Sequence, residues 1–165
     1  MRLFIAIPFT SKLKNELLRF QRELKANGLS GRFVPQENFH LTLAFIGEYG
    51  NPEDVLDVIG TVPFEPFEIR LSGFGHFQDL YWAGIADNPA LNAYVKNLRR
   101  ALAESGIPYD RKKFSPHITL IRRASFRDKS ALAVSRPPEG SMTVDRISLM
   151  RSDRGKNGMI YTELS

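Results

Sequence analysis

The chain has 165 residues, enough for one domain or for two small lobes that share a core. Its 23 Lys and Arg side chains against 18 Asp and Glu give a net charge of +5, which favours anionic partners. The chain has no cysteine, which excludes disulfides, thiolate nucleophiles and cysteine-ligated zinc, and it has no apolar run long enough to span a bilayer. We therefore expect a globular, cytoplasmic protein.

An apolar strand and an amphipathic helix open the chain. The segment MRLFIAIPFTSK lacks the small-residue cleavage site of a signal peptide and predicts a first strand. Thr10 and Ser11 are typical helix N-cap residues, and Gly28 suits a left-handed helix end. Between them, apolar residues recur at i, i+4, i+7 and i+11: Leu13, Leu17, Phe20 and Leu24. This stripe predicts a helix with one buried face, and a polar, extended loop then leads to His40.

The middle of the chain predicts shorter elements. Asn51-Pro52-Glu53 is typical of a helix start, and we expect that helix to continue to Ile59. Phe67 to Leu71 alternates as a strand. The glycine-rich stretch GFGHFQ follows, and we expect its histidine, His76, to lie in a loop.

The strand and helix of the amino-terminal part then recur. Leu80 to Ala83 is a second apolar, strand-like run, and Asn88 before Pro89 is typical of a helix cap. The same i, i+4, i+7, i+11 stripe follows in Leu91, Val95, Leu98 and Leu102. Gly106 ends this second predicted helix, as Gly28 ends the first.

The carboxy-terminal part predicts a hairpin. Ser130 to Val134 indicates a short helical turn, and the run RPPEG at 136–140 breaks regular structure. Met142 to Met150 and Met159 to Leu164 are then expected to pair, with RSDRGKNG as the loop between them.

One tetrapeptide pattern, His-aliphatic-Thr-Leu, occurs twice, as HLTL from His40 and as HITL from His117. Positions i and i+2 of a strand point to the same face, so each histidine shares a face with the threonine that follows it, Thr42 or Thr119. When the sequence is shifted so that His40 falls on His117, the two predicted strands and the two predicted helices also fall on each other.

This repeat predicts an α+β fold with an internal duplication. We expect residues 1–165 to form one bilobal domain of two pseudo-symmetric lobes, an HLTL half and an HITL half. Each lobe would be an antiparallel sheet with flanking helices, and the two would enclose a central groove. A pseudo-twofold relation would bring His40 and His117 to opposite sides of one site.

Two histidines and two threonines suffice for chemistry on a cyclic phosphate. Histidine serves as acid or base near neutral pH, and a threonine hydroxyl donates one hydrogen bond to a phosphate oxygen. One group must take a proton from water and another must protonate the leaving oxygen, while fixed donors hold the other oxygens. The pattern therefore predicts paired acid–base catalysis that needs no metal and no cofactor.

Other interpretations of these residues are weaker. A single His-x-Thr is typical of a buried histidine with a satisfied hydrogen bond, but two equivalent copies argue against that interpretation. His40, His117 and a carboxylate could bind zinc, yet neither motif places an acid at a ligand spacing. The chain has no G-x-S-x-G elbow, and the glycines at 73–75 lack the third glycine of a dinucleotide motif.

Basic residues bracket the second motif. The cluster comprises Arg111, Lys112, Lys113, Arg122, Arg123 and Arg127. Such a cluster is often only a solvated surface, but its position beside a histidine motif favours a phosphate-rich ligand.

The paired motifs resemble those of the 2H phosphoesterase superfamily, and most closely the RNA 2′,3′-cyclic phosphodiesterases, which are 2′-5′ RNA ligase-like. The likeness runs through most of the chain. It is carried by these segments, in order: RLFIAIPF, VPQENFHLTLAFIGE, LYWAGI, FSPHITLIRR and ISLMRSDRGKNGMIYTEL.

The resemblance implies hydrolysis of a 2′,3′-cyclic phosphate at an RNA end to a 2′-phosphate. It implies that His40 is the proton donor and His117 the proton acceptor, and that Thr42 and Thr119 bind the phosphate. By the same likeness Phe45 would stack on a base and Arg122 would contact a phosphate. Regular alternation, however, would put Phe45 and Arg122 on the strand faces opposite the histidines.

Three functions remain open at the level of sequence. The first is the metal-independent RNA cyclic phosphodiesterase, and the second uses the same site on another cyclic nucleotide or joins RNA ends as a reversible 2′-5′ ligase. The third is a non-catalytic RNA-binding module, against which the two intact histidines argue. The expected partner is RNA or an oligonucleotide with a 2′,3′-cyclic phosphate end, with no membrane and no obligate protein partner, and we expect a monomer.

Overall fold

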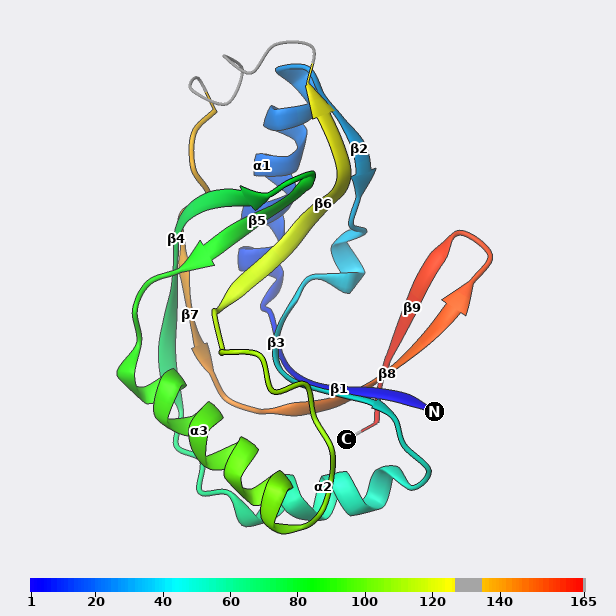
Figure 1. The fold of residues 1–165 in the computed structure, drawn as a ribbon. Coiled ribbons are helices and arrows are strands. Elements are labelled where there is room, and N and C mark those ends of the chain that lie inside the picture. The colour runs from blue at the N-terminus through cyan, green and yellow to red at the C-terminus, as the bar shows by residue number, and fades with distance from the viewer. Residues whose placement is uncertain (127–134, 165) are drawn as a thin grey trace.

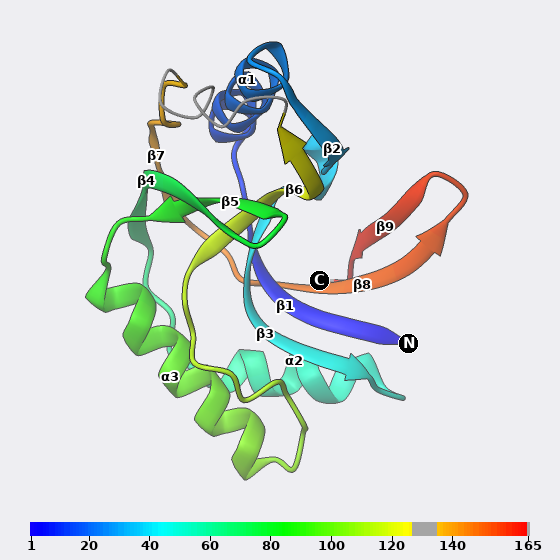
Figure 2. The same ribbon diagram turned by 45° about the horizontal axis from the view of Figure 1, so that its top comes forward.

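The computed structural model describes residues 1–126 and 135–164, and it confirms the predicted α+β fold with two curled antiparallel sheets (Figure 1). The turn predicted at Ser130 to Val134 lies outside the described residues. In Figures 1 and 2 the two motif strands, β3 (His40–Glu48) and β6 (His117–Phe126), belong to different sheets and lie near the middle of the molecule. No helix in the described part of the chain is long and apolar enough to cross a membrane.

The first sheet holds the HLTL motif and has four strands among the described residues. In sheet order they are β3 (His40–Glu48), β1 (Arg2–Pro8), β8 (Ser148–Gly155) and β9 (Gly158–Glu163). The first and last segments of the chain thus lie side by side, because β1 pairs with β8 as well as with β3.

The second sheet holds the HITL motif and has five strands in the part of the chain described. In sheet order they are β2 (Leu29–Phe33), β6 (His117–Phe126), β5 (Leu80–Ile85), β4 (Phe67–Phe77) and β7 (Ser141–Val144). The β2 strand corrects the prediction from sequence, which placed only an extended loop there. Its polar residues carry no apolar alternation, and they become a strand because β6 offers an edge to pair with.

The helices begin and end where the sequence predicts. The helix α1 (Ser11–Ala26) starts where the backbone N–H of Leu13 donates to Thr10 Oγ1, and α3 (Pro89–Glu104) starts with an equivalent bond from Leu91 to Asn88. The shorter helix α2 (Pro52–Thr61) packs against α3. Every residue of the two predicted stripes is buried. Burying one face of each helix supplies most of its stability.

Each long helix packs on the sheet of the other half. The helix α1 follows β1 of the four-stranded sheet, but its Phe20 ring packs against Phe74 of the five-stranded sheet, with 4.9 Å between ring centroids. The helix α3 follows β5 of the five-stranded sheet and contacts β3 of the four-stranded sheet as well as β4 of its own. Figures 1 and 2 show α1 beside β2 and β6, and α3 at the other end of the molecule.

This exchange is fixed by two polar side chains that reach equivalent carbonyls. The buried amide of Gln21 in α1 donates to the carbonyl of Leu120 at 2.9 Å, and the guanidinium of Arg99 in α3 donates to the carbonyl of Leu43 at 3.0 Å. Leu43 and Leu120 are the last residues of the two motifs. Each motif strand is therefore held by a helix that belongs, in sequence, to the other half.

The carboxy-terminal hairpin differs from the prediction. Met142 to Met150 is not one strand, because β7 ends at Val144 in one sheet and β8 begins at Ser148 in the other. The sequence does not reveal this change of sheet, because apolar and polar residues keep alternating through it and both sheets bury every second residue. The predicted loop at 151–158 is mostly strand, and only residues 156–157 form the turn, because paired ribbons tolerate charged side chains on an open face.

His76 lies in a strand and not in the expected loop. Despite its glycines, β4 continues to Phe77 and pairs with β5, where His76 stacks on Tyr81 with ring centroids 5.0 Å apart. A register shift between Leu71 and Phe74 accommodates Gly73, at φ 69°, within the strand.

Candidate active site

Both motif histidines stand at the first residue of a strand, and the two strands, β3 and β6, contact each other. The second residue of each motif, Leu41 or Ile118, is fully buried beneath its sheet. The histidine and threonine of each motif are half-buried on the opposite face. The predicted alternation thus holds across both tetrapeptides, and the structure brings the two open faces together.

Each histidine ring is oriented by a carbonyl that comes shortly before it in the chain. Nδ1 of His40 lies 2.7 Å from the carbonyl oxygen of Asn38, and Nδ1 of His117 lies 2.7 Å from that of Ser115. A carbonyl oxygen can only accept, so Nδ1 carries the hydrogen and donates it. In the neutral rings Nε2 is then the unprotonated nitrogen, and it is the atom available to move a proton. Asn38 and Ser115 occupy the same position relative to their motifs, so the anchor is repeated together with the histidine.

A β-bulge brings Phe45 to the face of His40, which corrects the expectation from alternation. Ala6 pairs with Thr42 but Ile5 pairs with Ala44, so one extra residue, Leu43, enters β3. The next pair is Phe4 with Phe45. Directly paired residues share a face, and Phe4 lies on the His40 side, so Phe45 does too.

An equivalent bulge turns Arg122. Trp82 pairs with Thr119 but Tyr81 pairs with Ile121, so the extra residue in β6 is Leu120. Ile121 is buried, and Arg122 after it returns to the face of Thr119. Regular alternation would have put Phe45 and Arg122 on the faces opposite the histidines. Because of the two bulges, both side chains lie instead on the open faces that carry the motifs.

His40 is enclosed by aromatic rings. Its ring centroid is 4.8 Å from that of Phe4 and 5.1 Å from that of Tyr161, and its Nε2 lies 3.0 Å from Thr42 Oγ1. Burial disfavours the charged imidazolium and is the main reason that the pKa of His40 is lowered from 6.5 to about 4. The hydrogen bond to the Asn38 carbonyl raises this pKa, and the positive charge of Arg122 on the second motif strand lowers it further.

His117 has a more open setting. Its nearest aromatic neighbour is Trp82, with ring centroids 6.4 Å apart, and the hydrogen bond from its Nδ1 to Ser115 is exposed. Two nearly identical motifs thus place their imidazoles in different surroundings, His40 against two aromatic rings and His117 near one.

One hollow lies beside His40, and another lies beside the segment that precedes His117. The hollow beside His40 has a volume of about 250 Å³, and its walls include the aromatic ring of Tyr161 and the charged side chains of Lys14, Glu37 and Arg146. The hollow beside the second motif has a volume of about 540 Å³ and is lined in part by Trp82, Lys113 and the segment Ser115–Pro116 that precedes His117.

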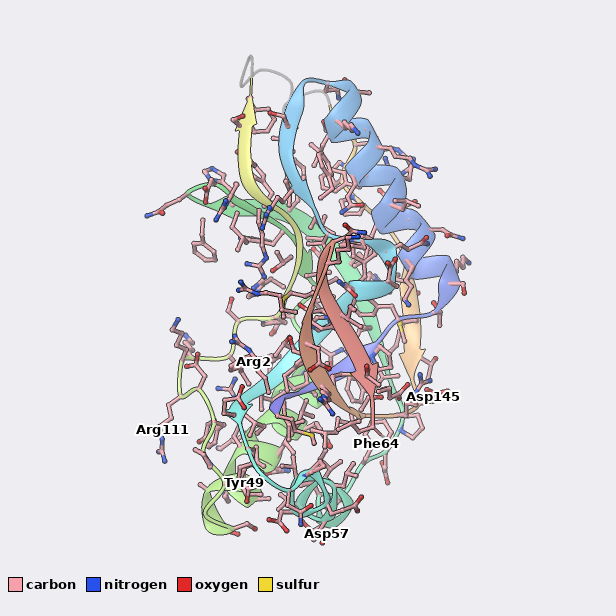
Figure 3. The ribbon with its side chains drawn as sticks, turned by 90° about the vertical axis from the view of Figure 1, so that its right-hand side faces the viewer. Arg2, Tyr49, Asp57, Phe64, Arg111 and Asp145 are labelled. Carbon is pink, nitrogen blue, oxygen red and sulfur yellow. The ribbon has the colours of Figure 1, made fainter. Side chains whose placement is uncertain are left out.

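The basic residues that bracket the second motif lie in different surroundings. Figure 3 shows the Arg111 side chain pointing outward from the loop between α3 and β6, where its guanidinium lies 5.4 Å from the Tyr109 ring. The backbone carbonyl of Lys112 accepts a bond of 2.7 Å from Arg99. Arg122 faces the site, and Arg127 lies outside the described residues.

Sequence reasoning missed several residues around the site. Tyr161 comes from the far end of the chain, and no sequence signal connects it to His40. The pairing of Arg32 in β2 with Arg122 was equally hidden, because β2 was not predicted as a strand. Trp82 could have been found from the sequence, because its strand was predicted and because Trp82 and Gly84, two residues apart in that strand, share the face near the second motif. Among residues 1–126 and 135–164, no three His, Asp or Glu side chains are grouped so as to hold a metal ion.

The chain resembles proteins of known class over nearly its whole length. Residues 12–156 match the 2′-5′ RNA ligase superfamily. An RNA 2′,3′-cyclic phosphodiesterase of Escherichia coli is 32% identical over 171 residues, which cover 99% of this chain and 93% of that protein. One of Geobacillus stearothermophilus is 31% identical over 129 residues, and there the match covers 73% of this chain but 41% of the relative.

Solved structures agree with this likeness. The crystal structure of Escherichia coli LigT complexed with 3′-AMP superposes with a TM-score of 0.81 at 29% identity, over 99% of this chain and 94% of that one. The fold is therefore similar to that of solved phosphoesterase structures. The chain belongs to the 2′-5′ RNA ligase superfamily.

Proposed function

We propose that this protein hydrolyses the 2′,3′-cyclic phosphate at an RNA end to a 2′-phosphomonoester without a metal ion. The observation that carries the proposal is the pair of imidazoles with equivalent orientation, each held through Nδ1 on two strands in contact, with Nε2 of His40 in hydrogen-bond contact with Thr42 Oγ1. The named activity of the relatives described above supports the same substrate.

The proposed reaction assigns one step to each motif. Water attacks phosphorus as its proton passes to Nε2 of His117, and the bond between phosphorus and the 3′ oxygen breaks. That oxygen takes a proton from Nε2 of His40, which leaves a 2′-phosphate and a 3′-hydroxyl. Thr119 donates a hydrogen bond to a non-bridging oxygen, where negative charge builds. Thr42 does the same once His40 is protonated, because Nε2 of His40 then no longer accepts the one hydroxyl hydrogen of Thr42. Arg122 adds a positive charge beside the phosphate, and Phe45 supports the base of the terminal nucleotide.

The environment of His40 sets a condition on this assignment. With a pKa of about 4, His40 is neutral near pH 7 in the free protein, whereas a proton donor must be protonated. A phosphate anion bound beside the ring raises that pKa, because it stabilises the imidazolium and offsets the charge of Arg122. The same low pKa favours a second assignment, in which His40 accepts the proton of water and His117 donates to the leaving oxygen.

A leaving group that needs no proton separates the two assignments. We expect the histidine that donates to become dispensable when the leaving group is p-nitrophenolate, while the acceptor stays essential. The measurement is hydrolysis of an aryl phosphodiester and of a nucleoside 2′,3′-cyclic phosphate by His40→Ala and His117→Ala. Recovery of His40→Ala on the aryl substrate supports the first assignment, and recovery of His117→Ala supports the second.

Hydrolysis itself is tested with a nucleoside 2′,3′-cyclic phosphate in EDTA. We expect turnover to a 2′-phosphate, identified by phosphorus NMR, and we expect it to survive chelation. Loss of activity in EDTA with recovery on adding zinc would contradict the metal-independent reaction. Joining of an added 5′-hydroxyl oligonucleotide in place of water would identify the reversible ligase as the principal activity, and binding without turnover would identify an RNA-binding module.

We further propose that residues 1–165 form one bilobal domain that arose by duplication, acting as a cytoplasmic monomer. The histidine anchors and the bulges recur at the same positions relative to the two motifs, which supports the duplication. Because α1 and α3 pack on each other's sheets, we expect the HLTL half alone, cut after Phe77, to remain unfolded by circular dichroism. A folded half would contradict the single domain, and a dimer in size-exclusion chromatography would contradict the monomer.

A further inference from the structure

The open face of the five-stranded sheet carries aromatic side chains beyond the proposed catalytic residues. Trp82 pairs with Thr119 on one side and with Gly75 on the other, so it shares the face of the second motif. Phe77 is the next residue of β4 after Gly75 that points to this face. Its side chain is 63% exposed, and its ring centroid is 6.1 Å from that of Trp82.

Glycines shape this aromatic surface. A Cβ on Gly75 would come within 2.5 Å of the Trp82 ring, so the indole occupies the space where a side chain of β4 would stand. Gly84 pairs with His117, and a Cβ built on Gly84 would lie 3.5 Å from the Trp82 ring. The indole therefore lies along the sheet from β4 toward His117. With Phe77 at the end of the β4–β5 hairpin, it forms a continuous aromatic surface that leads away from the site.

Two arginines lie on the other side of β6 on this face. Arg32 of β2 pairs directly with Arg122, and both side chains are exposed. Neither has an ion pair or a hydrogen bond with an acidic side chain within the described ranges. Like charges directly opposite each other on a sheet destabilise it, and an anion between them removes that repulsion. The backbones of β2 and β6 lie close together at Gly31, which has a φ of 151°. A Cβ at this position would lie 2.9 Å from the carbonyl oxygen of Arg122.

From this arrangement we propose that the open face of the five-stranded sheet binds the single-stranded RNA that precedes the cyclic phosphate. Phe77 and Trp82 stack on bases, and Arg32 together with Arg122 contacts backbone phosphates. Aromatic faces beside a basic pair are the means by which proteins hold unpaired nucleotides. This inference rests on the proposed function for the position of the RNA end, and it adds which surface holds the nucleotides that precede that end.

The first experiment compares a pentanucleotide that ends in a 2′,3′-cyclic phosphate with a mononucleoside 2′,3′-cyclic phosphate. The quantity to compare is the ratio of kcat/KM on the pentanucleotide to kcat/KM on the mononucleotide. We expect this ratio to fall roughly 5- to 100-fold in Phe77→Ala, which loses one stacking contact, and to fall less in Arg32→Gln. His76→Ala lies on the other face of the same hairpin, and Arg22→Gln removes an exposed arginine of α1. These matched controls should leave the ratio unchanged. An unchanged ratio in Phe77→Ala and Arg32→Gln would overturn the proposal.

The second experiment measures binding without turnover, so that it stands apart from the proposed chemistry. Trp82 is the only tryptophan of the chain, so its fluorescence reports on this face alone. A pentanucleotide with a plain 3′-phosphate should quench Trp82 emission and bind less tightly to Phe77→Ala and Arg32→Gln. An RNA duplex should compete poorly, because its bases are already stacked. Saturating binding with unchanged emission, or equal competition by the duplex, would overturn stacking on this face. Absence of hydrolysis together with these binding results would instead reject only the proposed reaction.

Discussion

The two motif halves share a framework and differ in what surrounds it. In both, a carbonyl just before the motif orients the histidine, and a bulge after the threonine turns a further side chain to the site. The ring of the first histidine packs against Phe4 and Tyr161, whereas the nearest aromatic ring to the second is that of Trp82. A repeated sequence thus supplies two similar groups, and the fold gives them different surroundings, of which the burial of His40 lowers its pKa.

Replacing the histidines should have the largest effect. We expect His40→Ala and His117→Ala each to lower turnover of a nucleoside cyclic phosphate by about 100- to 10,000-fold, because each removes one proton transfer. His76→Ala is the control, since it is the remaining histidine of the chain and lies away from this face. Unfolding curves should show that the variants stay folded. Near-normal turnover in either motif variant would contradict the shared mechanism.

Replacing the threonines should separate the two halves. We expect Thr42→Val and Thr119→Val to lower kcat by roughly 10- to 1,000-fold, as for a lost donor to a developing charge. Thr42 also contacts its own histidine, at 3.0 Å, so Thr42→Val should in addition shift the pH profile of kcat/KM. The full pH profiles of both variants test this. Equal shifts in the two would mean that the contact with His40 has no influence on its ionisation.

Burial of His40 should appear as a dependence of stability on pH. The pKa of His40 is lowered on folding, so the unfolded chain binds its proton first, and stability falls as the pH drops from 6.5 toward 4. The full loss is about 3 kcal/mol, at about 1.36 kcal/mol per pH unit. We expect urea unfolding between pH 7 and 4 to show a shallower fall in His40→Gln than in the unmodified protein. His76→Gln serves as the control, and a slope unchanged by His40→Gln would contradict the burial of a neutral imidazole.

The helix anchors should matter to both halves. Gln21→Met keeps the length of the side chain but removes the donors to Val34 and Leu120, and we expect it to lower the free energy of unfolding by about 1–3 kcal/mol. Arg99→Met should have a similar effect and should also release the Lys112 carbonyl in the segment before His117. Urea denaturation measures both. Arg100→Met, on the exposed side of α3, should change stability little.

The smallest expected effect concerns the backbone after each bulge. Gly47 has a φ of 84° near the end of β3, and Arg123 adopts a φ of 52° at nearly the same place in β6. A left-handed conformation is unfavourable for arginine, so Arg123→Gly should raise the free energy of unfolding by up to about 1 kcal/mol. Arg123→Val should lower it, because a β-branched side chain tolerates this conformation poorly. Thermal unfolding of the two variants tests the sign.

The sequence by itself predicted the α+β class, the caps and buried stripes of α1 and α3, and the two His-Thr faces. These features depend on local spacing, since the helical and the strand periodicities are each visible within a single segment. The family likeness rested on the same local motifs. The β2 strand and the division of residues 142–150 between two sheets escaped prediction, because pairing partners far along the chain decide them.

The tertiary structure decided what completes the site. Bulges at Leu43 and Leu120 turn Phe45 and Arg122 to the open faces, and such an extra residue depends on the register of the neighbouring strand rather than on the tetrapeptide. Tyr161 reaches His40 only because β9 joins the sheet of β3, and burial by that ring and Phe4 lowers the pKa of His40. The residue types set which groups can ionise, but their distance from water and from other charges, which only the fold fixes, determines when they do.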